Sequence, residues 1–287
     1  MALTSSITTQ NQHYRRGEAS KSVDTHVIQR ADYFRWKVAL DLAIACLLLI
    51  PVSIMIAILV LLVCMTSRGP GIYQQIRVGK HGRRFMIYKI RTMRVNAEAA
   101  SGPVWTQSGD PRVTFLGVLL RKLHLDELPQ LFNVLRGEMS FVGPRPERPE
   151  FVRVLSETVP RYRDRLLVRP GITGLAQINL PPDSDLMSVR RKVALDLDYI
   201  GHGNLWLDVR LLLCTALRVF KVPEGFLVWI LDLQRPEPLA AINASGEACS
   251  GPEEATPGTI LLQAAQASMS NGAPRKDFQP VTSHKPR

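Results

Sequence analysis

The sequence predicts an α+β fold that is mostly helical and attached to a membrane. Three observations support this expectation. An apolar run extends from Leu42 to Met65, and the segment from Ile72 to Met93 reads as two strand-like runs around a glycine-flanked turn. Most later segments carry apolar residues at helical spacing. The predicted β-structure is therefore one small hairpin among helices.

The composition restricts the kinds of partner. The chain has 287 residues and a net charge of +11, and most of the basic excess falls between residues 38 and 234. This favours anionic partners, namely membrane lipid, a phosphorylated substrate or nucleic acid. The four cysteines are scattered and show no metal-ligand spacing, a pattern that is typical of a reducing compartment.

Changes in composition divide the chain into four predicted parts. Residues 1–33 are polar and are expected to be a disordered tail, whereas residues 34–66 are expected to be inserted in a membrane. Residues 67–233 form the predicted globular domain, in which the small, polar stretch 96–111 reads as a loop over a site. Residues 234–287, rich in Pro, Ala and Ser, are expected to be a second disordered tail.

The apolar run is long enough to cross a bilayer. At roughly 1.5 Å per residue it would reach about 36 Å as a helix, against a hydrocarbon core of about 30 Å. Pro51 lies near its middle and is expected to kink or break the helix. Basic residues flank both ends, so the positive-inside rule favours neither orientation. The residues leave two arrangements open, a kinked transmembrane helix and a re-entrant hairpin with both ends on the cytoplasmic face.

The predicted β-hairpin is strongly basic. Lys89 and Arg91 alternate with Tyr88 and Ile90, so they share one face of the second strand. Directly after a membrane segment, basic residues attract anionic headgroups and phosphates. Lys89 and Arg91 are therefore candidate phosphate-binding residues.

The stretch from His124 to Gly137 places two adjacent carboxylates, Asp126 and Glu127, at the start of a predicted helix. Pro129 is tolerated only in the first turn of such a helix, and Gly137 suits the left-handed position after its end. Asp126 is expected to cap this helix, whose N-terminus would attract phosphate. Alone, the acidic pair indicates a simple helix cap, and the helix N-terminus with its basic neighbours indicates an affinity for phosphate.

A rigid turn, Pro144-Arg145-Pro146, follows shortly afterwards. Gly143 and Arg145 each precede a proline, which pushes their backbone toward extended geometry. Pro144 and Pro146 are therefore predicted to be structural residues that hold Arg145 stiffly, as phosphate binding requires. The same pattern on its own is also typical of an ordinary turn.

Four stretches resemble the bacterial sugar transferase family, the monotopic phosphoglycosyl transferases that act on polyprenol phosphate. With the apolar run they cover about residues 34 to 222, and they read QIRVGKHGRRFMIYKIRTM, LRKLHLDELPQLFNVLRGEMSFVGPRPE, VRPGITGLAQIN and LDLDYI. The resemblance implies a monotopic protein with a re-entrant helix bent at Pro51, interfacial amphipathic helices and a small β-hairpin. It places residues 67–233, as the catalytic domain, on the cytoplasmic face of the bacterial inner membrane.

The resemblance also implies an activity. The family transfers a sugar phosphate from a UDP-sugar to undecaprenyl phosphate, releases UMP and starts the synthesis of exopolysaccharide, capsule or another surface glycan. Carried over by motif, Asp126 is the nucleophile and a ligand of Mg²⁺, Glu127 is its partner, and Arg121 and Arg145 hold phosphates. Anionic lipid and downstream glycosyltransferases are further implied partners. Leu175, where relatives often have Trp, and the loop 180–188 depart from the family pattern, so the sequence does not name the sugar.

One alternative is a non-catalytic membrane adaptor whose basic hairpin binds anionic lipid. Nucleic-acid binding is disfavoured, because the basic residues follow a membrane segment and no recognition-helix or finger motif occurs. The sequence also lacks the motifs of serine hydrolases, P-loop enzymes and zinc hydrolases. Release of UMP that depends on Asp126 would distinguish the enzyme from the adaptor.

Overall fold

The computed structural model describes residues 31–95, 97, 110–183, 185–219, 222–236 and 238, which form a mostly helical domain with one long apolar helix near the N-terminus. Most of both predicted tails, and most of the expected loop 96–111, lie outside the described residues. The elements are, in chain order, α2 (Ala31–Thr66), β1 (Ile72–Val78), the 3-10 helix η1 (Lys80–Gly82), β2 (Arg84–Ile90), α3 (Phe115–Lys122), the 3-10 helix η2 (Leu125–Gln130), α4 (Leu131–Leu135), β3 (Ser140–Val142), α5 (Pro149–Thr158), the 3-10 helix η3 (Tyr162–Leu167), β4 (Gly171–Thr173), α6 (Leu175–Asn179), α7 (Leu186–His202), α8 (Leu205–Val219) and α9 (Glu224–Ile230).

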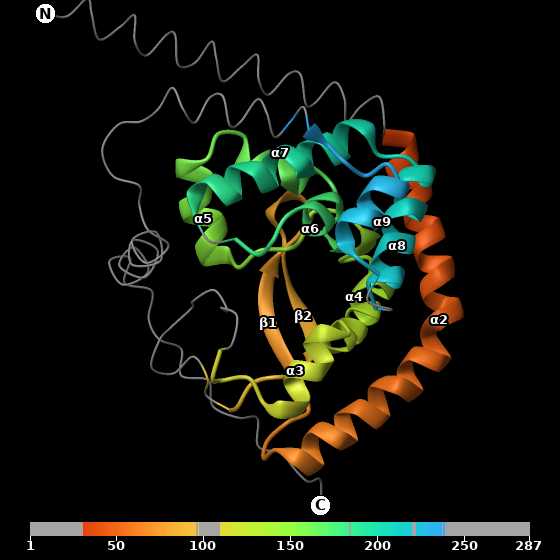
Figure 1. The fold of residues 1–287 in the computed structure, drawn as a ribbon, viewed down its shortest axis with the longest axis vertical. Helices are drawn as coiled ribbons and strands as arrows, with labels where there is room; N and C mark the ends of the chain where they lie inside the picture. The colour runs from red at the N-terminus through yellow and green to blue at the C-terminus, as the bar shows by residue number, and fades with distance from the viewer. Residues whose placement is uncertain are drawn as a thin grey trace, which may run out of the picture.

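Helix α2 is long and apolar enough to cross a membrane. Only 17% of its most apolar window is buried, so it is not the core helix of a soluble domain. Pro51 lies inside the helix without ending it. Figure 1 shows α2 bending partway along its length and curving around one side of the domain. A proline supplies the physical cause of such a bend, because it removes one backbone hydrogen bond and crowds the preceding turn.

Large apolar side chains are exposed on four helices. Phe115 of α3 is 97% exposed, and Trp206 of α8 and Trp229 of α9 are 66% and 65% exposed. Many apolar side chains of α2 are exposed as well, among them Trp36 and Leu47. An apolar surface of this extent is typical of a membrane or partner contact.

A buried polar cluster attaches the first half of α2 to the rest of the domain. Lys37 pairs with Asp208 of α8 and lies 3.6 Å from Asp41. The Ser140 hydroxyl donates to Asp41 at 2.6 Å, and the Tyr199 hydroxyl donates to Asp208 at 2.8 Å. Helix α2 is thereby tied to β3, α7 and α8, so the apolar helix and the domain form one structural unit.

The predicted hairpin is confirmed. Strands β1 and β2 pair antiparallel from Ile72 opposite Ile90 to Val78 opposite Arg84. The turn between them uses left-handed backbone at His81 and Gly82, with φ of 56° and 76°. In Figure 1 the hairpin lies near the middle of the view, with α4 beside β2, α3 at one end of the hairpin and α5 to α7 near the other. This position allows β2 to support residues 124–137, called here the acidic stretch, which follow α3.

A second strand pair, β3 with β4, is parallel and was not predicted. Ser140 lies opposite Gly171, and Val142 lies opposite Thr173. The backbones approach so closely that a Cβ on Gly171 would lie 2.1 Å from the Gly143 nitrogen. Only glycine permits this approach, and it places the chain after β3, the Pro-Arg-Pro turn, beside the chain that leads into β4.

The apolar core is divided into several clusters around these strands. The largest joins α7, α8 and α9 and includes the buried Tyr199, Leu207, Leu211, Cys214 and Leu227. A second cluster packs α5 and η3 against α7, and two smaller ones pack β2 against α2, α3 and α4. The acidic stretch therefore lies on the side of β2 that faces the long apolar helix.

Candidate active site

The acidic stretch begins differently from the prediction. The chain turns at His124, which has left-handed backbone (φ 54°), and then forms the 3-10 helix η2 before continuing as α4. Asp126 lies inside the first turn of η2, so the expectation that it caps a helix is wrong. Pro129 is accommodated in this early segment, and Gly137 ends α4 with φ of 71°, as predicted. Because Asp126 does not cap backbone amides, its carboxylate is left for another role.

Asn133 holds the acidic stretch against strand β2. Its side-chain amide donates to the Met86 carbonyl at 2.7 Å and accepts from the Tyr88 amide at 3.3 Å. The same amide group donates to Glu138 at 2.7 Å. Asn133 is fully buried, so these bonds replace all contact with water. They align β2 with η2 and bring Lys89 to the acidic pair.

Replacing Asn133 with leucine should lower the free energy of unfolding by about 3 kcal/mol. Leucine has the same number and branching of side-chain heavy atoms but leaves the Met86 carbonyl, the Tyr88 amide and the Glu138 carboxylate without this partner. Thermal or urea unfolding of the detergent-solubilised protein measures the effect. The control is Asn179→Leu, which removes one side-chain hydrogen bond at a half-buried position. Equal losses in the two variants would contradict the role of Asn133.

Glu127 is held between two cations. Lys89 Nζ lies 2.7 Å and Arg145 Nη2 lies 2.6 Å from the same carboxylate oxygen, Oε1. Burial by itself would raise the pKa of Glu127, but the charges of Arg145 and Lys89 hold this pKa well below its ordinary value. Glu127 is therefore ionised and occupied. It is suited to fixing the two cations and unsuited to carrying a proton.

Asp126 is the unoccupied carboxylate of the pair. It is 7% exposed, and within the described part of the chain its carboxylate has no hydrogen bond and no ion pair within 4.0 Å. Burial raises the pKa of Asp126, Lys89 and Arg121 oppose this effect, and the neighbouring charge of Glu127 adds to it. A carboxylate with free lone pairs and cations nearby can attack phosphorus or bind a metal ion.

Two arginines lie near the acidic pair: Arg121 precedes it in the chain, and Arg145 follows it. Arg121, at the end of α3, donates from Nε to the Thr92 hydroxyl at 2.8 Å, and its guanidinium interacts electrostatically with Asp126. The side chain of Arg145 is 39% exposed, so this guanidinium touches Glu127 and also faces solvent. The structure therefore brings together Lys89, Arg121, Asp126, Glu127 and Arg145, as the sequence predicted.

Arg91 lies elsewhere. Its Nη2 donates to the Ser67 carbonyl at 2.9 Å and to the Ser67 hydroxyl at 2.6 Å, just after the end of α2. Strand β2 ends at Ile90, so the expected alternation with Lys89 does not continue to Arg91. Arg91 is 6% exposed. It thus connects the end of the apolar helix to the hairpin, and the expectation that it shares a phosphate-binding face with Lys89 is not supported.

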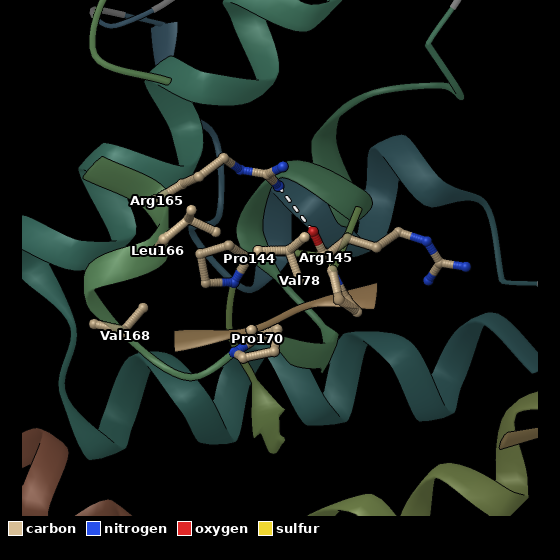
Figure 2. Close-up of a pocket in the computed structure, with 9 residues that line it drawn as sticks. Val78, Pro144, Arg145, Arg165, Leu166, Val168 and Pro170 are labelled. Carbon is tan, nitrogen blue, oxygen red and sulfur yellow. Dashed lines mark hydrogen bonds between the residues drawn. The ribbon is translucent and has the colours of Figure 1, made fainter. Parts of the chain in front are cut away.

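The Pro-Arg-Pro turn is surrounded by contacts from other elements, and the stiffness of its two prolines stays a prediction. Figure 2 shows a hollow behind the turn, lined by Val78, Pro144, Leu166, Val168 and Pro170, with Arg165 reaching to the Arg145 carbonyl while the Arg145 side chain points away. The next residue, Glu147, accepts from Lys192 Nζ at 2.8 Å, and Lys192 also pairs with Asp183.

Sequence reasoning missed Arg165, Lys192 and Asp196. Asp196 lies in the LDLDYI stretch and Glu147 in the PRPE stretch, so both fall within motifs. Asp196 pairs with Arg165, 31 residues away in the chain, and Glu147 pairs with Lys192, 45 residues away. Contacts over such distances leave no local pattern, because only the tertiary fold sets which charges meet.

The acidic pair suits Mg²⁺. Mg²⁺ is usually held by one or two carboxylates together with substrate phosphates and water, and Asp126 offers one free carboxylate among cations that recognise phosphate. Within the described residues there is no cluster of three or more His, Cys, Asp or Glu side chains. The donor set therefore fits an ion that arrives with a phosphorylated substrate better than one in a cage made by the protein.

Comparison with known proteins identifies the family. The family model for bacterial sugar transferases matches residues 32–222. An undecaprenyl-phosphate glucose phosphotransferase of Komagataeibacter xylinus is 41% identical over 204 residues, which are 67% of this chain and 38% of that protein. A UDP-N-acetylgalactosamine-undecaprenyl-phosphate N-acetylgalactosaminephosphotransferase of Aeromonas hydrophila is 47% identical over 148 residues, 52% of this chain and 35% of that protein.

A third relative is closer in length. A UDP-glucose:undecaprenyl-phosphate glucose-1-phosphate transferase of Caulobacter vibrioides is 40% identical over 184 residues, 63% of this chain and 68% of that protein. The chain thus spans little more than a third of the first two relatives and about two thirds of the third. The matched region contains the acidic pair, the basic hairpin and the Pro-Arg-Pro turn. The chain belongs to the bacterial sugar transferase family.

Proposed function

We propose that this protein transfers a sugar 1-phosphate from a UDP-sugar to undecaprenyl phosphate, releases UMP and so starts the synthesis of a surface glycan such as exopolysaccharide or capsule. The observation that carries the proposal is the unequal state of the acidic pair. Glu127 is bound by Lys89 and Arg145, whereas Asp126 is buried, free and surrounded by cations. The names of the relatives supply the substrate class.

The reaction has two displacements at one phosphorus atom. A carboxylate oxygen of Asp126 attacks the phosphorus that bears the sugar, the bond from this phosphorus to the bridging oxygen breaks, and UMP leaves with that oxygen. An acyl phosphate now joins Asp126 to the sugar phosphate. A phosphate oxygen of undecaprenyl phosphate then attacks the same phosphorus, the bond to Asp126 breaks, and the carboxylate is regenerated.

Each cation has a task in this scheme. A carboxylate repels a diphosphate, so guanidinium and ammonium groups must neutralise the phosphate oxygens as the nucleophile approaches. Arg121 and the exposed part of Arg145 are placed to hold phosphate, and Lys89 shares its charge between Glu127 and Asp126. Glu127 positions two of these cations and leaves Asp126 without an ion-pair partner. Glu127, which is ionised and paired with both cations, carries no proton in this scheme.

Asp126, together with the substrate phosphates, would hold Mg²⁺. When bound, Mg²⁺ would supply additional neutralisation of the phosphate charge.

The membrane arrangement follows from the lipid substrate. The phosphate of undecaprenyl phosphate lies at headgroup depth, so the nucleophile must be held at that depth. We assign α2 as a re-entrant helix bent near Pro51, with α3, α8 and α9 in the interface through their exposed apolar residues. The basic hairpin then faces anionic lipid on the cytoplasmic side of the inner membrane. Downstream glycosyltransferases would take up the lipid-linked product.

The test is UMP release by purified protein with Mg²⁺, undecaprenyl phosphate and a panel of UDP-sugars that includes UDP-glucose and UDP-N-acetylgalactosamine, since the relatives carry both names. Release with at least one donor, dependent on the lipid phosphate, is expected. No release with any donor would contradict the proposal and favour the membrane adaptor.

A further inference from the structure

The turn that presents Arg145 is held entirely by other elements. Two of its residues are prolines and have no backbone N–H to donate. Four consecutive carbonyls, from residue 144 to residue 147, each accept a hydrogen bond from outside the turn. The donors are Gly171 N to Pro144 O at 3.0 Å, Arg165 Nη2 to Arg145 O at 2.9 Å, Arg77 Nη1 to Pro146 O at 3.2 Å and Val78 N to Glu147 O at 2.9 Å.

Arg165 holds the carbonyl of Arg145 itself. Its side chain is 1% exposed and pairs with Asp196 of α7, whose side chain is 2% exposed. Arg165 Nη2 lies 2.7 Å and Nε lies 2.9 Å from Asp196 Oδ2, while Nη1 donates to the Tyr162 hydroxyl at 3.2 Å. The planar guanidinium is therefore fixed on one edge by α7, while Nη2 also donates to the Arg145 carbonyl and Nη1 lies 3.9 Å from Glu147 Oε1.

We infer that Arg165, oriented by Asp196, is a positioning residue for the transfer reaction: it sets the backbone of Arg145 so that the Arg145 guanidinium reaches Glu127 and the substrate phosphate. The inference rests on the proposed function. The geometry gives a direct line of contacts, from Asp196 to Arg165, from Arg165 to the Arg145 backbone, and from the Arg145 side chain to Glu127 at 2.6 Å. Neither Arg165 nor Asp196 is required to touch the substrate.

Helix α7 contains a matched control. Asp198, two residues after Asp196, also accepts from an arginine, since Arg235 Nε lies 3.0 Å from Asp198 Oδ2. The side chain of Asp198 is 10% exposed, so it is nearly buried as well. Within the part of the chain that the structure describes, Arg235 also donates to carbonyls of residues 232 and 234, and this pair makes no hydrogen bond to the Pro-Arg-Pro turn. Asp198 also lies 2.9 Å from His202 Nδ1. The two carboxylates each have an arginine partner and differ in what that arginine holds.

The first measurement compares conservative variants. Arg165→Lys keeps a positive charge for Asp196 but lacks the planar group that also reaches the Arg145 carbonyl, and Asp196→Asn keeps the shape but removes the orienting charge. Each should lower kcat/KM by about 10- to 100-fold, since small misplacement of a catalytic group costs this much. Asp198→Asn should stay within about twofold of the unchanged protein. Gel filtration and unfolding curves establish that each variant is folded, and Asp196→Asn carries the test if Arg165→Lys does not fold.

A double-mutant cycle separates positioning from general damage. When Arg145 is already replaced by lysine, the Arg165→Lys or Asp196→Asn change should cost less than about threefold, because the group that it positions is gone. A merely structural role would give the same loss in both backgrounds. Equal losses, or a loss in Asp198→Asn as large as that in Asp196→Asn, would overturn the inference.

A structural measurement, which needs no enzyme activity, separates a failure of this inference from a failure of the proposed function. In an experimental structure of Asp196→Asn, the Arg145 guanidinium should have left hydrogen-bond distance of Glu127. If this contact persists, the inference is wrong whatever the enzyme transfers. If the unchanged protein releases no UMP from any UDP-sugar, the proposed function fails, and this structural result still decides the role of Arg165.

Discussion

Replacement of Asp126 with asparagine is expected to reduce UMP release by more than about 1,000-fold. Asparagine keeps the size of the side chain and its fit in η2, but the amide oxygen is a poor nucleophile and cannot form the acyl phosphate. The structure adds a reason to expect a large effect. Glu127, the adjacent carboxylate, is occupied by Lys89 and Arg145 and is not free to replace Asp126.

The covalent step can be measured directly. Protein incubated with a UDP-sugar labelled in the sugar, without lipid acceptor, and then denatured should retain the label, and Asp126→Asn should retain none. Asp164→Asn is the matched control, because Asp164 is a carboxylate on the 3-10 helix η3 that pairs with Arg161 at 3.0 Å on the surface. Full turnover by Asp126→Asn would falsify the nucleophile assignment.

Replacement of Glu127 with glutamine should lower kcat by about 100-fold or more through its effect on Asp126. The neutral amide no longer balances Lys89 and Arg145, whose distances to Glu127 are 2.7 and 2.6 Å. Asp126 is then the one carboxylate of the pair that still carries a charge. We expect the two cations to turn toward it, so that its lone pairs are occupied and the nucleophile is weakened.

Steady-state kinetics with the preferred UDP-sugar test this prediction. Glu150→Gln is the control, because Glu150 is a partly exposed carboxylate paired with Arg148 at 3.6 Å. Turnover of Glu127→Gln at the rate of the unchanged protein would show that the cations need no carboxylate to hold them. A loss limited to substrate affinity, with kcat unchanged, would likewise contradict the proposed role.

Local patterns in the sequence predicted most of the elements. Alternation and turn glycines predicted the β1–β2 hairpin. Helical spacing predicted helical stretches at 113–123, 151–167 with a break at Pro160, 189–200 and 205–220, where the structure has α3, α5, α7 and α8. The stretch at Asp126 was predicted to start one regular helix with Asp126 as its cap. It forms a 3-10 helix and then a short α-helix, since left-handed backbone at His124 begins the turn earlier. The propensity of a histidine for that conformation is too weak to be predicted.

The sequence also identified the five residues of the candidate site by their motifs. It did not predict the parallel pairing of β3 with β4, because three-residue strands far apart in the chain carry no local signal. It grouped Arg91 with Lys89 by alternation, but the strand ends before Arg91, and its side chain binds Ser67 after α2. The contact between Arg91 and Ser67 joins residues 24 apart in the chain, which local sequence does not encode.

The sequence by itself thus determined the family, the long apolar helix, the basic hairpin and the identity of the acidic pair, because these depend on composition and short-range spacing. Only the tertiary structure decided which carboxylate of the acidic pair is bound by cations and which is free. Glu127 is occupied because Lys89, 38 residues before it, and Arg145, 18 residues after it, meet at one oxygen, and Asp126 is left free. The same holds for Arg165, whose place behind the Arg145 turn depends on a carboxylate 31 residues away. Charges that are distant in the chain acquire roles only when folding sets which of them are neighbours.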